Sequence, residues 1–152
     1  MNKLEQLLDK LESTIPQLEY LNPAISKAAV GWHIEHSLLT LDVVTGALKK
    51  SDPAAYKWKF NLVRMVVFIT KKIPRGKAKS PDVVIPKGSL TEETLQGHLE
   101  MTREKIKALN GLPPNQHFDH PFFGKLNVKP TITFLNIHTR HHLDIINDIL
   151  KN

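Results

Sequence analysis

Two histidines near the end of the chain have the spacing that a shared metal ion requires. The run IHTRHH over residues 137–142 places His138 and His142 four residues apart. In a helix, residues four apart lie one turn above each other, with Cβ atoms about 5–6 Å apart, so their imidazole rings can close on one ion. The pair predicts a metal site that takes a third ligand from elsewhere in the chain.

The helix that carries this pair is expected to begin near Pro130. Its apolar residues recur at steps of three and four, so one stripe of the helix must face a core. This stripe is formed by Phe134, Leu135, Ile145, Ile146 and Ile149. His138 and His142 lie within the stripe, whereas His141, followed on its own side of the helix by Asp144 one turn later and Asp148 two turns later, lies outside it.

The third ligand is expected on a core-facing stripe of a second helix, predicted over about residues 23–50. Two histidines compete there, His36 and His33. The neighbours of His36 along its face of the helix are Ala29, Trp32, Leu39 and Val43. His33 has more polar surroundings, with Ser37 and Thr40 following it. His36 is therefore the preferred third ligand, and His33 remains the alternative.

Composition restricts the ligands of any transition metal to histidine and carboxylate. The 152 residues include eight histidines and no cysteine, which excludes disulfides and thiolate sites. Three neutral imidazoles leave at least one position on the ion free, which is typical of reactive rather than closed structural sites. An ion held in this way lowers the pKa of bound water to about 7 or keeps a thiol as its thiolate.

The rest of the chain is predicted as helices joined by polar or proline-rich segments. We expect helices over about residues 2–18, 23–50, 53–72, 89–110 and from 130 onward, a long basic loop over 74–88, and a proline- and aromatic-rich stretch over 112–129. In the 53–72 helix the expected buried line is Trp58, Leu62, Met65, Val66 and Ile69. No segment alternates as a strand would, so residues 1–152 are predicted to form a single all-α domain.

Positive charge gathers in one third of the chain. Residues 57–87 contain nine Lys or Arg and a single acid, Asp82. Such a patch attracts anions, but no recognised nucleic-acid module accompanies it, so we expect an anionic small molecule rather than nucleic acid. No apolar run approaches the roughly 20 residues that a membrane span needs. We therefore expect a cytoplasmic protein without a membrane partner.

The placement of the histidines resembles that of the DinB-like superfamily, which includes bacillithiol- and mycothiol-dependent enzymes. The similarity covers most of the chain in layout and is most specific over residues 32–39 and in the HPFFGKL segment at 120–126, which precedes HTRHHL at 138–143. It implies a DinB-like four-helix bundle with one additional helix. It also implies a divalent metal ion, zinc or nickel, on His36, His138 and His142. Where many members carry a glutamine after the last ligand, this chain has Leu143, Asp144 and Ile145.

Further residues are expected around the triad. Trp32, one turn from His36, is expected to shield that histidine. Asp144 is expected to hydrogen bond to His141 or to one of the metal ligands, and so to orient its ring without binding the metal itself. His120 and His141 are the candidates for an acid or base. Phe122 and Phe123 are predicted to pack near the site. Outside it, His117 is expected to be an exposed loop histidine, and His98 to face solvent because Thr94, Thr102 and Lys105 are its helical neighbours.

Two functions of different classes follow from these expectations. The first is a metal-dependent enzyme, either a hydrolase or a transferase that joins a low-molecular-weight thiol to a small electrophile. The second is a binding or stress-associated interaction protein in which the triad is structural or empty, its histidines hydrogen bonded to neighbouring helices. In both cases a homodimer through an apolar helix face is compatible with a helical bundle.

Overall fold

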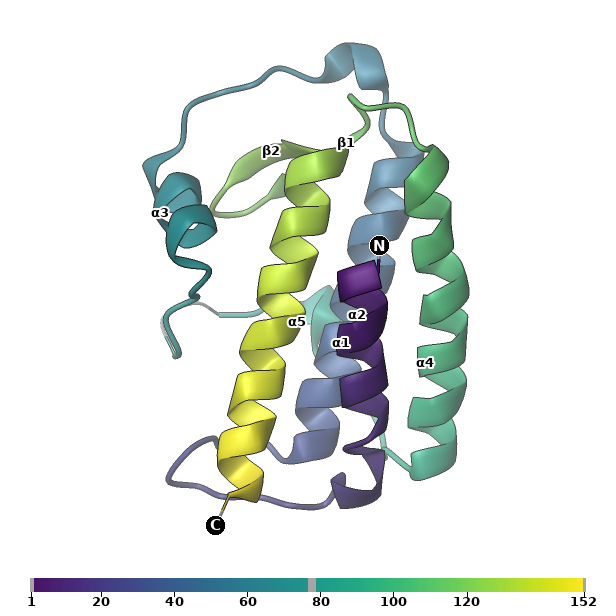
Figure 1. The fold of residues 1–152 in the computed structure, drawn as a ribbon, viewed down its shortest axis with the longest axis vertical. Helices are drawn as coiled ribbons and strands as arrows, with labels where there is room; N and C mark the ends of the chain where they lie inside the picture. The colour runs from purple at the N-terminus through teal and green to yellow at the C-terminus, as the bar shows by residue number, and fades with distance from the viewer. Residues whose placement is uncertain (1, 77–78, 152) are drawn as a thin grey trace.

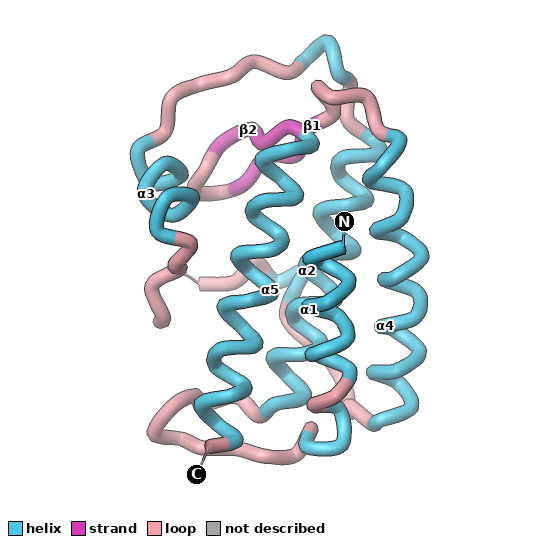
Figure 2. The backbone as a smooth tube through the Cα atoms, in the orientation of Figure 1, coloured by secondary structure: helices cyan, strands magenta, loops and turns pink. Residues whose placement is uncertain are grey.

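Four long helices packed side by side form the body of the protein. They are α1 (Asn2–Glu12), α2 (Val30–Lys50), α4 (Glu92–Lys107) and α5 (Val128–Leu150), and Figures 1 and 2 show them as one bundle. The computed structural model describes residues 2–76 and 79–151. The predicted all-α class is confirmed, with one small two-stranded sheet added to it. Among the described residues, no helix is both long and apolar enough to cross a bilayer.

The first helix is shorter than its apolar pattern predicts. It ends at Glu12, and a separate turn of 3-10 helix follows over Ile15–Gln17. Pro16 causes this break because proline has no N–H to continue the α-helical hydrogen bonds. Leu18 nevertheless remains buried, together with the leucines of α1.

The second helix begins at Val30 rather than at Pro23, and its first amides bond outside the helix. The N–H of Val30 donates to the carbonyl of Tyr20, and the N–H of Gly31 donates to that of Leu18. A Cβ at residue 31 would lie 3.2 Å from Leu18, so glycine permits this close approach. The preceding loop is thereby held against the start of α2.

The face of α2 that packs into the core is not the one that the sequence favoured. The core stripe consists of Val30, Ile34, Leu38, Leu41, Val44 and Leu48. The predicted stripe, represented by Trp32, Val43 and Ala47, is only half-buried and lines a cavity instead. α2 is apolar on two faces, and only one of them faces the core.

The predicted helix over residues 53–72 is largely absent. A 3-10 turn covers Pro53–Ala55, the chain then runs extended, and α3 spans only Leu62–Thr70. The Asn61 side chain caps α3 by accepting from the N–H of Arg64. Of the α3 residues only Val67 is buried, so the predicted buried line is wrong.

Arg64 of α3 connects this segment to the neighbouring hairpin. Its guanidinium donates hydrogen bonds to the main-chain carbonyls of Lys59, Phe123 and Lys125.

That hairpin forms within the proline- and aromatic-rich stretch, where no strand was predicted. Strands β1 (His117–His120) and β2 (Gly124–Asn127) pair antiparallel, with His120 opposite Gly124. The Nδ1 atom of His120 accepts hydrogen bonds from the N–H groups of Phe122 and Phe123 in the turn. Gly124 closes the turn with a φ of +68°, a conformation that favours glycine. The hairpin lies beside α5 (Figure 1).

The fourth helix begins at Glu92 and is capped by Thr91, slightly later than the predicted start near Ser89. The Thr91 side chain accepts from the N–H of Thr94, and the Thr94 hydroxyl accepts from the N–H of Thr91. The predicted apolar line of α4 is buried and completes the core; it comprises Leu95, Leu99, Ile106 and, in the 3-10 turn Ala108–Gly111, Leu109. The predicted basic loop over 74–88 contains a further 3-10 turn at Asp82–Val84; its residue Lys77 lies outside the described residues.

His98 does not face solvent as the sequence predicted. Its Nδ1 atom lies 2.9 Å from a Glu35 carboxylate oxygen, and its Nε2 atom lies 3.3 Å from Asp42. These bonds, first that to Asp42 and then that to Glu35, raise the pKa of His98 to about 9. The histidine is therefore a cation at pH 7 and joins α4 to α2.

We expect this ionic contact to make stability depend on pH in the alkaline range. The pKa of His98 is higher in the folded protein than in the unfolded chain, so its contribution is complete below about pH 6.5 and disappears as the pH rises through about 9. Below pH 6.5 a His98→Gln variant should be about 2 kcal/mol less stable than the parent. Urea unfolding at pH 6, 8 and 10 measures this difference; a gap that stays constant to pH 10 would contradict the ionic role.

Candidate metal centre

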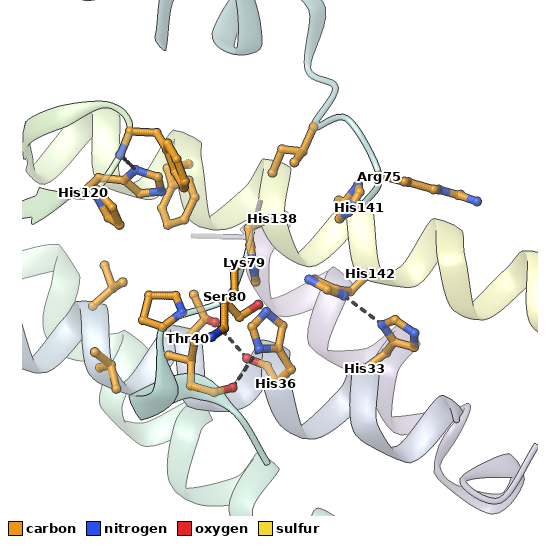
Figure 3. Close-up of a pocket in the computed structure, with 18 of the residues that line it drawn as sticks. His33, His36, Thr40, Arg75, Lys79, Ser80, His120, His138, His141 and His142 are labelled. Carbon is orange, nitrogen blue, oxygen red and sulfur yellow. Dashed lines mark hydrogen bonds between the residues drawn. The ribbon is translucent and has the colours of Figure 1, made fainter. Parts of the chain in front are cut away.

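Three histidines from two helices converge at one place inside the bundle. His36 comes from α2, and His138 and His142 come from α5, one turn apart. One ring nitrogen of each can be chosen so that all three lie within 4.8 Å of one another. Figure 3 shows the three rings directed toward a common centre. The structure therefore brings together the three residues that the sequence preferred.

The hydrogen bond made by His36 leaves one ring nitrogen free to bind a metal ion. Its Nδ1 atom lies 2.7 Å from the main-chain carbonyl of Val84, and a carbonyl can only accept, so Nδ1 carries the proton. Nε2 is then a lone-pair donor. The indole of Trp32 stacks on the His36 ring with centroids 4.8 Å apart and planes 11° from parallel. Trp32 thus covers the His36 ring, as predicted.

His33 lies one hydrogen bond outside the triad. Its Nδ1 atom is 3.0 Å from Nδ1 of His142, and its Nε2 atom is 3.0 Å from the hydroxyl of Ser26. If His142 donates through Nδ1, its Nε2 is free as a ligand, and the proton of His33 then lies on Nε2, toward Ser26. His33 therefore orients His142 and does not replace His36. Ser26 and the Val84 carbonyl had no signal in the sequence, because both lie in irregular segments.

Burial keeps the three rings in the form that can bind a cation. Loss of solvation is the largest cause that lowers the pKa of His36, and it lowers the pKa of His138 and His142 to well below the ordinary value. The neighbouring histidines lower the pKa of His138 and His142 further, because like charges would repel. At neutral pH all three rings are uncharged and have a free lone pair.

The triad borders a cavity of about 730 Å³. The cavity lies between α2, α5, the hairpin and the 73–84 segment, and part of its wall is apolar, formed by Val43, Ala47, Val83, Phe118, Phe134 and Ile145. Lys27, Arg75 and Lys79 contribute positive charge to its lining, although Arg75 also pairs with Asp148 at 2.8 Å. A space of this size is sufficient for a small organic molecule.

The two histidines predicted as an acid or base differ in their availability. Both His120 and His141 line the cavity. Nδ1 of His120 is already engaged by the hairpin amides, and desolvation lowers its pKa to about 4. Burial also lowers the pKa of His141, and its ring makes no hydrogen bond to another described residue. His141 is therefore free to exchange a proton with a bound molecule.

Of the remaining residues that the sequence singled out, Phe123 lies as predicted and the others do not. Phe123 is buried, stacked on His120 with ring centroids 4.0 Å apart, and packs as predicted. Phe122 is 51% exposed at the cavity mouth, so its predicted packing role is wrong. Asp144 is exposed and makes no hydrogen bond with His141; it acts on that ring through charge alone. His117, expected to be an exposed loop residue, is buried in β1 with Lys125 Nζ 3.1 Å from its Nε2.

The donor set fits a divalent transition metal ion. Imidazole nitrogen suits zinc and nickel, and the hydrogen bonds of His36 and His142 fix the rings in the manner typical of metal ligands. Tetrahedral zinc spaces its nitrogen ligands roughly 3.3–3.5 Å apart, so binding would draw the rings slightly closer together.

Comparison with known proteins gives one match. The family model of the DinB superfamily matches residues 2–146, which is nearly the whole chain. No curated protein and no solved structure gives a significant match.

Proposed function

The chain belongs to the DinB superfamily, and from this premise we propose that it is a metal-dependent enzyme. His36, His138 and His142 would hold one divalent ion, zinc or nickel. The reaction would be a hydrolysis or the transfer of a low-molecular-weight thiol to an electrophile. The observation that carries the proposal is that three uncharged imidazoles converge at the border of a cavity large enough for a substrate.

Each residue around the triad has a definable part in this function. The Val84 carbonyl and His33 hold the His36 and His142 rings in orientation, and Trp32 limits access of water to His36. A bound ion would supply Lewis acidity, which lowers the pKa of water or of a thiol toward neutral pH. The apolar wall binds the carbon skeleton of the substrate, while Lys27 and Lys79 attract a negative group.

His141 is the residue that we assign to proton transfer. It lines the cavity, and its ring is uncharged at neutral pH, so it can accept the proton that the nucleophile releases. His120 is less suited, because protonation of its Nδ1 would break the two hydrogen bonds that hold the hairpin turn. A proton on His141 can later be returned to the leaving group.

Turnover with and without metal tests the proposal. The protein is stripped with a chelator and reloaded with zinc or nickel. Each form is then assayed with an activated aryl ester and with an electrophilic aryl halide plus a small thiol. We expect turnover of one substrate class in the loaded form, loss of at least tenfold on stripping, and recovery on reloading. Equal rates in the loaded and stripped forms would contradict a metal-dependent reaction. Metal binding without any turnover would favour the non-catalytic alternative.

A further inference from the structure

An apolar stripe of α3 faces away from the protein. Leu62, Met65, Val66 and Ile69 follow the spacing of one helix face, and all four are exposed, Ile69 by 73%. The opposite side of α3 carries Val67, its only buried residue. A solvent-facing stripe with this periodicity is unusual for a helix, because contiguous exposed apolar surface generally marks an interaction site.

The extended segment before α3 enlarges this apolar surface. Trp58 and Phe60 are 64% and 66% exposed. Both belong to a segment that is fixed to the body of the protein, since Arg64 binds the carbonyl of Lys59 and Asn61 Nδ2 donates to the carbonyl of Phe122 at 3.0 Å. Together these six side chains form what we call the α3 surface: Trp58, Phe60, Leu62, Met65, Val66 and Ile69.

The charge around the α3 surface is uniformly positive along the chain. Lys57 and Lys59 precede the stripe, Lys71 and Lys72 follow it, and all four are exposed. None of them forms an ion pair with a described residue. The chain has no acidic residue between Asp52 and Asp82. In space, the carboxylate of Asp144 shares a hollow with Lys71, Lys72 and Arg75, so positive charge still prevails there. These charges favour an occupant that combines apolar character with negative charge.

We propose that the α3 surface binds an anionic lipid bilayer. Exposed tryptophan, phenylalanine and aliphatic side chains flanked by lysines are the features of elements that lie in the membrane interface without crossing it. The sequence led us to expect no membrane partner because no apolar run is long enough to span a bilayer. That reason concerns crossing a membrane, and it does not apply to a surface that lies in the interface. A second copy of the chain fits less well, because both ends of the stripe carry lysines, and a two-fold contact would bring lysines of one copy near lysines of the other.

This binding is independent of the proposed metal chemistry. The α3 surface contains none of the triad residues, and α3 lies apart from α4 on the far side of the bundle (Figure 1). Phe122, exposed at the mouth of the cavity, is hydrogen bonded through its carbonyl to Asn61 at the start of α3. Docking at the α3 surface would therefore leave the cavity mouth close to the bilayer.

Vesicle binding tests the proposal directly. The full chain is mixed with vesicles of phosphatidylglycerol and phosphatidylcholine, or of phosphatidylcholine alone, and sedimented at low and high salt. We expect binding to the anionic vesicles, weakened by salt, and a blue shift in the emission of Trp58. Because each lysine near an anionic surface strengthens binding about fivefold, the double change Lys71→Gln with Lys72→Gln should weaken it by about 25-fold.

A matched pair of variants distinguishes binding through the α3 surface from non-specific adsorption of the protein to vesicles. Ile69→Glu places a charge in the stripe, whereas Met101→Glu makes the same kind of change at a 56% exposed position on α4. We expect at least a tenfold loss of vesicle binding for the first and none for the second. Equal behaviour of the two variants, or no sedimentation of the parent with anionic vesicles, would overturn the proposal. So would a dimer, seen by analytical ultracentrifugation, that Ile69→Glu dissociates.

Discussion

A His142→Ala variant is expected to bind zinc or nickel about a hundred- to a thousandfold more weakly than the parent protein. Structural zinc sites with four ligands bind with about 10–16 kcal/mol, so one ligand accounts for roughly 2.5–4 kcal/mol. His36→Ala and His138→Ala should lose affinity to a similar extent. Competition with a chromogenic chelator measures the dissociation constants, and elemental analysis of the purified variants should give near-zero metal content.

Two other histidines provide graded controls for this result. His33 contacts His142 through a single hydrogen bond. His33→Ala should therefore weaken metal binding only about 10–100-fold, which is the usual effect of removing a residue that is hydrogen bonded to a metal ligand. His141 lies next to the triad without belonging to it, and His141→Ala should leave metal affinity within a factor of about three while lowering turnover. If His141→Ala loses as much metal as His142→Ala, the assignment of the triad is wrong.

Metal binding should also raise the thermal stability of the folded protein. An ion that binds the folded chain alone contributes about 4 kcal/mol when its concentration is a thousand times the dissociation constant. The parent should therefore melt at a distinctly higher temperature with metal than with chelator. The His142→Ala variant should show almost no difference between the two conditions, which separates lost binding from lost folding.

Local periodicity predicted the pair of His138 and His142 and a preference for His36 over His33, and the resemblance to the DinB-like superfamily implied the same three residues. In α5 the predicted stripe is buried, so the two histidines within it were assigned to the correct face of the helix, although Ile137 and Leu143 outside the stripe are buried as well. In α2 the same reasoning selected His36, but it assigned the wrong face of the helix to the core. The predicted stripe lines the cavity, and another face of α2 packs into the core. His36 nevertheless lies beside His138 and His142, because this half-buried face of α2 lines the cavity that they border.

Periodicity could not reveal what covers a stripe. Leu62, Met65, Val66 and Ile69 have the spacing of a buried line, and they are exposed because no other described part of the chain covers them. Local sequence predicts that a helix has an apolar face, while the position of that face depends on contacts distant in sequence. Arg64 illustrates this, because it fixes α3 through carbonyls about 60 residues further along the chain.

Contacts between distant residues account for the other differences. His98 seemed solvent-facing because its helical neighbours are polar, yet its partners Glu35 and Asp42 lie 63 and 56 residues away. The hairpin escaped prediction because each strand has only four residues, too few for an alternating pattern to stand out. The Val84 carbonyl that orients His36 is a backbone group, and its role depends on position alone.

A Phe134→Ala variant is expected to lose about 3 kcal/mol of stability, the second large effect that the structure predicts. Phe134 is buried and contacts the hairpin and the metal centre together: its ring centroid lies 5.9 Å from those of Phe118 and Phe123, and 5.6 Å from that of His138. Removing a buried phenylalanine typically costs about 3–5 kcal/mol. The lower end applies here because the ring also lines the cavity, so part of its surface has no protein partner to lose.

Phe122→Ala is the matched control, since it removes the same kind of side chain from a 51% exposed position in the hairpin that Phe134 contacts. Urea unfolding should place this variant within about 0.5 kcal/mol of the parent, with an unchanged dependence on denaturant. Metal affinity should follow the same order, because only Phe134 contacts His138. If the two variants were equally stable, the hairpin would not be held to α5 through Phe134, and the wall of the cavity beside His138 would have to be maintained by other contacts.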